Sequence, residues 1–246
     1  MKTFYLTDAG KVRSHNEDSV NIVKNLNNEI LLVVADGMGG HKAGEVASSL
    51  VVNELSKRFS ELSSIGTKEE AVVWLKEIIE EINIKILRYA EEHVDANGLG
   101  TTCVCALLTN NFLLFGNIGD SSGFVYKKGK LYKVTKDHTL VNMLLESGEL
   151  TEEEAKTHPQ KNVLMKALGA AENVDADIFD VETSVDGIFL CSDGLTNMVT
   201  KEQIERVLND NTLDIEEKVD KLILKSNLRG GNDNISIAYL SREGVV

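Results

Sequence analysis

Apolar residues recur along the chain with two different periods, and each period predicts a different kind of element. Residues 20–23 and 30–35 are short runs rich in β-branched side chains, joined by an asparagine-rich link. Such a pattern predicts a β-hairpin. Apolar residues within 47–59 and 71–89 recur every three or four positions, which predicts two amphipathic helices. The sequence Thr67-Lys68-Glu69-Glu70 is a capping box at the start of the second helix.

The remaining predicted elements are mostly strands. Between residues 102 and 134 the links are too short for crossover helices, so the strands there must pair antiparallel. The predicted strands are 102–109, 112–118, 123–127, 130–134, 176–182, 187–191 and 235–240, and the later helices are 201–209 and 214–227. This order predicts an α+β fold in which antiparallel sheets are covered by helices.

Residues 137–173 interrupt this pattern. Short helical patterns at 140–146 and behind a capping box at 151–154 predict an inserted flap. The glutamates at 152–154 equally suit an ordinary helix start, because negative charge there is favourable to the helix dipole. Since the composition shows no linker-like break, we expect one domain over residues 1–246.

The chain is acidic: its 246 residues include 39 Asp and Glu against 26 Lys and Arg, a net charge of −13. Nucleic-acid binding needs clustered basic residues, which the sequence lacks, so nucleic acid is not an expected partner. The apolar runs are far shorter than the roughly 18–20 residues that cross a bilayer, and the N-terminus lacks a signal-peptide pattern. We therefore expect a cytoplasmic protein without a transmembrane segment.

Four aspartates lie at the ends of predicted core strands: Asp36, Asp120, Asp193 and Asp233. Taken singly, Asp-Gly is a common turn signal. Strand ends that are distant in sequence can nevertheless meet in a sheet fold, and converging carboxylates repel one another unless cations compensate. Oxygen ligands favour Mg²⁺ or Mn²⁺. The five histidines form no zinc-binding pattern.

Short motifs, four of which contain these aspartates, follow one another along nearly the whole chain. They are residues 7–18 (TDAGKVRSHNED), residues 36–41 (DGMGGH) with Gly44-Glu45, Gly100-Thr101-Thr102, Gly119-Asp120-Ser121, Ser192-Asp193-Gly194-Leu195 and Asp233-Asn234. Together they resemble the metal-dependent type 2C protein phosphatases, and most closely the single-domain bacterial serine/threonine phosphatases encoded beside a membrane-bound kinase. The resemblance implies a central antiparallel β-sandwich flanked by helix pairs, in four αββα layers, with a flap subdomain.

The resemblance also implies a centre of two Mn²⁺ or Mg²⁺ ions, with a third and weaker site. Asp36 would bridge both ions, and Asp193 and Asp233 would complete the first site. The backbone carbonyl of Gly37 would serve the second site. Asp120, together with Asp193, would hold the third ion.

Other matched residues would act around the ions. Glu17 and Asp18 would orient metal-bound waters, and Arg13 would bind the substrate phosphate through its planar fork. Eukaryotic members place a histidine, proposed as general acid, where this chain has Met38. Nearby His41 and a metal-bound water are equal candidates for that acid.

The implied activity is hydrolysis of phosphoserine and phosphothreonine in proteins by direct attack of a metal-bridged water or hydroxide. We expect a monomer whose partners are phosphorylated proteins, including a cognate bacterial Ser/Thr kinase that it counteracts. Two alternatives stay open: a specialised phosphatase of the same fold that controls sigma-factor antagonists, and a catalytically silent binding domain. Silent members typically lose metal aspartates, whereas Asp36, Asp193 and Asp233 are all present here.

Overall fold

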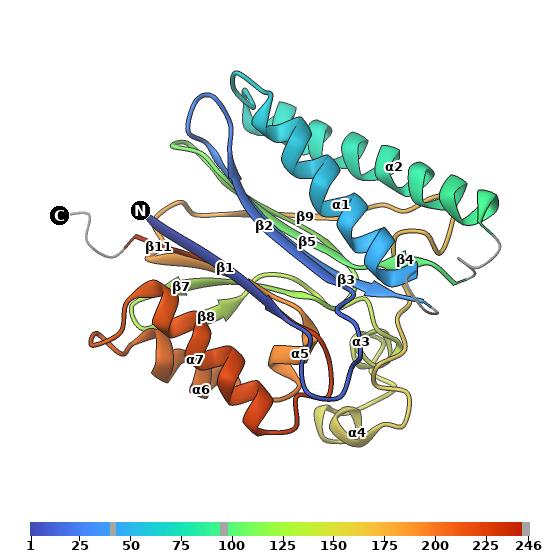
Figure 1. Cartoon of the computed structure of the whole chain (residues 1–246), viewed down its shortest axis with the longest axis vertical. Helices are drawn as coiled ribbons and strands as arrows, with labels where there is room; N and C mark the ends of the chain where they lie inside the picture. The colour runs from blue at the N-terminus through green and yellow to red at the C-terminus, as the bar shows by residue number, and fades with distance from the viewer. Residues whose placement is uncertain (40–42, 94–97, 243–246) are drawn as a thin grey trace.

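Two antiparallel sheets packed face to face form the centre of the molecule (Figure 1). The structure is a computed structural model that describes residues 1–39, 43–93 and 98–242. The first sheet runs in the order β1 (Lys2–Asp8), β11 (Ile235–Ser241), β10 (Gly187–Cys191), β7 (Ser122–Lys127) and β8 (Lys130–Lys133). The second runs in the order β2 (Asp18–Lys24), β3 (Ile30–Met38), β5 (Cys103–Leu108), β6 (Leu113–Ile118) and β9 (Asp177–Val181), and β4 (Gly100–Thr101) pairs with the end of β3.

Helix pairs cover the outer face of each sheet, which completes the four αββα layers that the sequence predicts (Figure 1). The helices α1 (Ala43–Ser60) and α2 (Lys68–Glu92) cover the second sheet, and α6 (Lys201–Leu208) and α7 (Ile215–Leu228) cover the first. Three shorter helices lie near one end of the sandwich: α3 (Leu140–Glu146), α4 (Glu152–Thr157) and α5 (Asp193–Thr196). None of the helices in the described ranges is both long enough and apolar enough to cross a membrane.

The central strands are buried on both faces, which explains why their sequences are continuous apolar runs. On β3, Val33 packs against the helix layer, whereas Val34 faces the gap between the sheets. On β10, Phe189 packs against α6 and α7, and Leu190 faces the same gap. Successive side chains of a strand point to opposite faces, so each central strand contributes to two cores at once.

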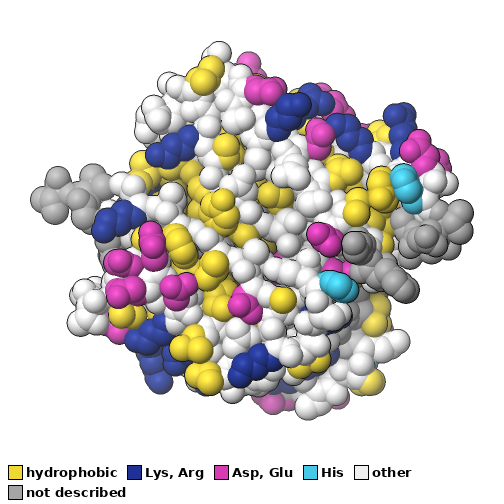
Figure 2. All heavy atoms as spheres, viewed as in Figure 1, with side chains coloured by type: hydrophobic (Ala, Val, Ile, Leu, Met, Phe, Trp, Pro, Cys, Tyr) yellow, Lys and Arg dark blue, Asp and Glu magenta, His cyan; other side chains and the backbone are white. Residues whose placement is uncertain are grey.

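Surface charge on the helix layer is mixed. In Figure 2, basic side chains stand beside acidic ones over α1 and α2. Arg58 pairs with Glu81 at 2.7 Å, and Lys85 pairs with Glu54 at 2.8 Å. Exposed pairs of this kind contribute little to stability. They do keep the net negative charge from forming a patch of one sign over these helices.

The capping box predicted for α2 is confirmed. The backbone N–H of Glu70 donates to Thr67 Oγ1 at 3.2 Å, and the N–H of Thr67 donates to Glu70 Oε2 at 2.7 Å. The box begins the helix at Lys68 because it satisfies backbone donors that have no partner within the helix.

Three parts of the sequence prediction were wrong or incomplete. The strand β1 was missed because it is an edge strand with one buried face, where Phe4 and Leu6 are its main apolar residues. Asp36 does not end its strand, since β3 continues to Met38 through pairing with β4. The short helix α5, which begins at Asp193, was also not predicted.

We expect Phe115→Ala to destabilise the fold by about 3–5 kcal/mol, because it would leave a cavity between the sheets. Phe115 is 0% exposed and belongs to the core between the two sheets. The free energy of unfolding in urea measures the effect. Tyr132→Ala on the exposed face of β8 is the control, since Tyr132 is 54% exposed. A loss below about 1 kcal/mol for Phe115→Ala would contradict a closed core at this position.

Candidate metal centre

The inward-facing positions of both sheets change from apolar to polar at one end of the sandwich. Val34 faces the gap between the sheets, so Asp36, two residues further along β3, lies on the same side. Asp18 on β2 is the cross-strand neighbour of Asp36. Leu190 likewise places Ser192 toward the gap, and Ser192 Oγ donates to Asp18 Oδ2 at 2.7 Å. The two sheets therefore meet here through a hydrogen bond to a buried carboxylate.

The backbone at Asp36 is held by the threonines of the Gly-Thr-Thr motif. The N–H of Asp36 donates to Thr102 Oγ1 at 2.9 Å, and Thr101 Oγ1 donates to the carbonyl of Asp36 at 2.9 Å. The next residue, Gly37, packs directly on the backbone of α1: a Cβ atom on it would lie 2.2 Å from the carbonyl oxygen of Gly44. A glycine is therefore required where β3 meets the start of α1.

A loop between β1 and β2 brings Arg13 to Asp233. Arg13 Nη2 lies 2.9 Å from Asp233 Oδ2, and half of the Arg13 side chain is exposed. Asn234 holds this loop in place: its Nδ2 donates to the carbonyl of His15 at 2.9 Å, and its Oδ1 accepts from the N–H of Glu17 at 2.8 Å. The guanidinium of Arg13 is thus fixed beside a carboxylate while part of it faces solvent.

Burial and mutual repulsion raise the pKa values of the clustered carboxylates. Burial is the largest cause for each, and it raises the pKa of Asp18 and that of Asp120 to about 7. The pKa of Asp36 is raised well above its ordinary value, by burial and then by repulsion from Asp18 and Asp193. Asp193 has a raised pKa for the same reasons, with Asp233 as its strongest repelling neighbour. Such shifts at one end of a fold are typical of a functional site.

The donor set fits a hard divalent cation. Asp18 Oδ1 and Asp193 Oδ1 are buried and accept no hydrogen bond, so each side chain has one oxygen without a partner. Within the described ranges, no three acidic, histidine or cysteine side chains are already gathered into a ligand cage. Instead Arg13 pairs with Asp233, and Asn197 Nδ2 donates to Asp193 Oδ2 at 3.0 Å. A divalent cation would replace these contacts and relieve the repulsion.

A cleft of about 300 Å³ opens beside these carboxylates. Asp120 and Asp193 line it together with Val141, Asn142 and Lys161 from the 137–173 segment. This segment contains α3 and α4, so the predicted flap region borders the carboxylate cluster.

The structure brings most of the predicted site residues together. Five carboxylates act on one another electrostatically: Asp18, Asp36, Asp120, Asp193 and Asp233. Glu17 lies beside them, and burial is the main cause of its raised pKa. His41 lies outside the described residues. Sequence reasoning assigned no role to Ser192, Thr102 or Asn234, although each stands inside a motif that pointed to the site.

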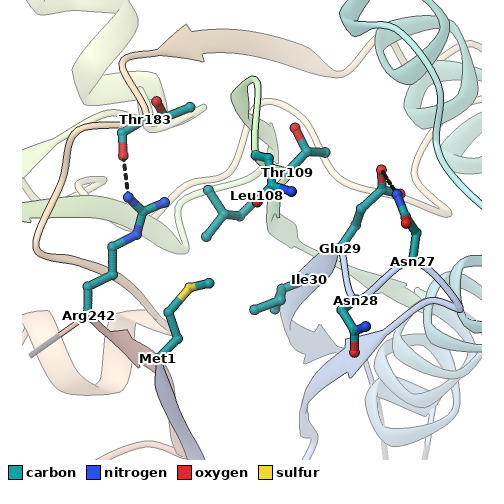
Figure 3. A pocket seen from close by; sticks show the side chains of 10 residues that line it. Met1, Asn27, Asn28, Glu29, Ile30, Leu108, Thr109, Thr183 and Arg242 are labelled. Carbon is teal, nitrogen blue, oxygen red and sulfur yellow. Dashed lines mark hydrogen bonds between the residues drawn. The ribbon is translucent and has the colours of Figure 1, made fainter. Parts of the chain in front are cut away.

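A second pocket, of about 250 Å³, lies at the opposite end of the strands (Figure 3). Arg242 and Thr183 line one side, where Arg242 Nη1 donates to the Thr183 carbonyl at 2.8 Å. Glu29 lines the other side. Burial alone would raise the pKa of Glu29, but hydrogen bonds led by the N–H of Ile65 outweigh it and lower that pKa. Glu29 is thus a satisfied structural carboxylate, unlike those at the other end.

Comparison with known proteins identifies the class of this fold and site. A sequence model of protein phosphatase 2C matches residues 9–229. The chain is 42% identical over 245 residues to the serine/threonine phosphatase stp of Listeria monocytogenes, covering 99% of this chain and 96% of that protein. The chain belongs to the protein phosphatase 2C family, and the predicted family and enzyme class are confirmed.

Solved structures agree with this assignment. Serine/threonine phosphatase Stp1 from Staphylococcus aureus superposes with a TM-score of 0.92 at 38% identity, covering 99% of this chain and 95% of that one. The catalytic domain of the phosphatase PstP, solved in complex with two manganese ions, gives a TM-score of 0.84 at 33% identity, covering 97% and 96%. The predicted four-layer α+β fold is therefore confirmed.

We expect the metal-free protein to lose stability as the pH rises from about 4 to about 7. The folded state raises the pKa of Asp18 from its ordinary value of about 3.9 to about 7 and so favours the protonated carboxyl. This contribution is complete below the unfolded pKa and is lost as the pH rises through the folded pKa. Its size is on the order of a few kcal/mol, since one pKa unit is about 1.4 kcal/mol. Urea unfolding in chelator at several pH values measures it.

Asp18→Asn should reduce this pH dependence, because the amide does not ionise. Asp220→Asn, on the exposed surface of α7, is the matched control and should keep the wild-type slope. Equal slopes for wild type and Asp18→Asn would contradict the assignment.

Proposed function

We propose that the chain is a metal-dependent protein phosphatase that hydrolyses phosphoserine and phosphothreonine. The observation that carries the proposal is the convergence of buried carboxylates, two of which have an oxygen without a partner, with Arg13 beside them. Neither buried oxygen, Asp18 Oδ1 or Asp193 Oδ1, has a hydrogen-bond partner. The names of the relatives, and the manganese ions of the PstP structure, support the same activity.

In the proposed site the carboxylates hold two Mn²⁺ or Mg²⁺ ions. Asp36 would contact both ions, Asp193 and Asp233 would complete the first site, and the Gly37 carbonyl would serve the second. Asp120 and Asp193 would hold a third, weaker ion. When bound, the pair of ions would supply an activated water as the nucleophile and would neutralise charge on the phosphoryl oxygens.

The protein groups around the ions position the reactants. Ser192 holds the Asp18 carboxylate by a 2.7 Å hydrogen bond, which suits Asp18 to orient a metal-bound water. Glu17 would act in the same way from the neighbouring position. Arg13 would donate two parallel hydrogen bonds to the substrate phosphate, since metal binding by Asp233 would release the guanidinium from its present ion pair. His41 and a metal-bound water are equal candidates for the acid that would protonate the leaving group.

We further propose that residues 1–246 act as one catalytic domain, with residues 137–173 as the flap over the cleft. The substrates would be phosphorylated proteins, including a bacterial Ser/Thr kinase that the enzyme counteracts. The sequence favours a monomer that acts in the cytoplasm without nucleic acid as a partner. The relatives' names support the substrate class, and the cleft beside Asp120 and Asp193 supports the role of the flap.

Asp193→Asn should reduce Mn²⁺-dependent hydrolysis of a phosphothreonine peptide by about 100-fold or more, because it removes a carboxylate from the proposed centre. Steady-state kinetics with added Mn²⁺ measure the loss, and chelator should abolish the wild-type activity. Asp220→Asn on α7 provides a control with the same change in charge. Activity that ignores both the chelator and Asp193→Asn would reject the proposed function.

Arg13→Lys should raise KM for the phosphopeptide by about 10-fold with a smaller change in kcat, because an ammonium cannot replace the bidentate guanidinium. Competition by inorganic phosphate should weaken to a similar extent. The matched control is Arg58→Lys, which changes an exposed ion pair on α1. Unchanged KM and phosphate inhibition in Arg13→Lys would remove Arg13 from the phosphate site.

A further inference from the structure

The turn that carries Asp120 depends on a glycine in an unusual conformation. Gly119 follows β6 and has φ +100°, a region that side chains rarely adopt. A Cβ atom at Gly119 would lie 2.5 Å from Thr102 Cγ2. The turn is therefore tightly shaped on one side, and whatever holds the peptide groups of Gly119 also determines where the Asp120 carboxylate lies.

His138 binds both peptide groups of Gly119. Its backbone N–H donates to the carbonyl of Gly119 at 3.0 Å, and its ring Nδ1 accepts from the N–H of Gly119 at 3.0 Å. Asn117 Nδ2 also donates to that carbonyl, at 3.2 Å. Because Nδ1 accepts a hydrogen bond, the ring proton of the neutral imidazole is on Nε2. Nε2 is buried and lies 3.3 Å from Asp177 Oδ2, without the alignment of a hydrogen bond.

His138 is at the same time the root of the flap region. Its carbonyl accepts from the N–H of Met165 at 2.8 Å, where the chain returns from α4. The next residue, Thr139, caps α3 through its Oγ1. Leu140 N–H then donates to the carbonyl of Val163 at 2.9 Å. The outgoing and returning parts of the flap region are therefore joined next to His138, the residue that is hydrogen-bonded to Gly119.

We propose that His138 is a positioning residue that holds the Asp120 turn and the root of the flap as one unit. The affinity of the Asp120 metal site and the position of the flap over the cleft would then change together. The inference rests on the proposed function for the role of Asp120 as a metal ligand. Partners that orient a ligand commonly change metal affinity by about 10–100-fold, because an unrestrained ligand must be ordered when the ion binds.

Two substitutions separate the two nitrogen atoms of the ring. His138→Asn keeps an acceptor at the position of Nδ1, so it can still bind the N–H of Gly119. His138→Gln places its amide near the position of Nε2 and leaves no acceptor at the δ position. Calorimetric titration of the full chain with Mn²⁺ should show the weaker site reduced by about 10–100-fold in His138→Gln. His138→Asn should restore its affinity to within a few fold of wild type.

Three controls identify the site and the cause. Asp120→Asn should remove the same weak binding that His138→Gln reduces. His93→Gln changes an exposed histidine at the C-cap of α2, whose Nδ1 contacts the Tyr89 carbonyl, and should bind Mn²⁺ as wild type does. Thermal unfolding of each variant shows whether the fold is retained.

The steady-state constants KM and kcat for a phosphopeptide give a second measurement, which reports on the position of the flap. His138→Gln should raise KM for a phosphopeptide more than it lowers kcat at saturating Mn²⁺, and His138→Asn should rescue KM. Equal Mn²⁺ affinity in wild type and His138→Gln would overturn the inference, and so would equal losses in the Gln and Asn variants. If the wild type does not hydrolyse the phosphopeptide, the proposed function fails, while the Mn²⁺ titrations still decide the role of His138.

Discussion

Asp18 and Asp36 face each other on neighbouring strands at the end of the sandwich, and the charge of Asp18 raises the pKa of Asp36. Charges brought this close inside a fold repel strongly, because the protein interior screens them less than water does. Asp193 and Asp233 add to the repulsion from the other sheet. The two sheets can pack here when the carboxylates are protonated or compensated by cations, and this requirement links the fold to its metal chemistry.

The neutral residues around the carboxylates are as important to the site as the charges. Ser192 ties Asp18 to the opposite sheet, Thr102 holds the backbone of Asp36, and Asn234 anchors the loop that carries Arg13. Each makes a hydrogen bond of 2.7–2.9 Å to a polar group of the site: the Asp18 carboxylate, the Asp36 N–H and the His15 carbonyl. The carboxylates are therefore held in a rigid frame, and a bound ion would find its ligands largely oriented.

Much of the fold was predictable because its elements have strong local signals. The central strands are apolar on both faces, and α2 starts at a capping box whose two hydrogen bonds are present. The edge strand β1 escaped prediction because one buried face left it with few apolar residues. The last residues of β3 were not predicted because they form a strand only through pairing with β4, which is more than sixty residues away in the sequence.

The sequence by itself determined the apolar periods, the helix caps and the identity of the motif aspartates, since these depend on neighbouring residues. The tertiary structure decided which side chains meet. Ser192 contacts Asp18 because the two sheets pack face to face. His138 binds Gly119, just before Asp120, because the chain folds back there at the start of the flap region. Such contacts join residues far apart in the chain, and their geometry depends on strand register and side-chain direction, which no local pattern specifies.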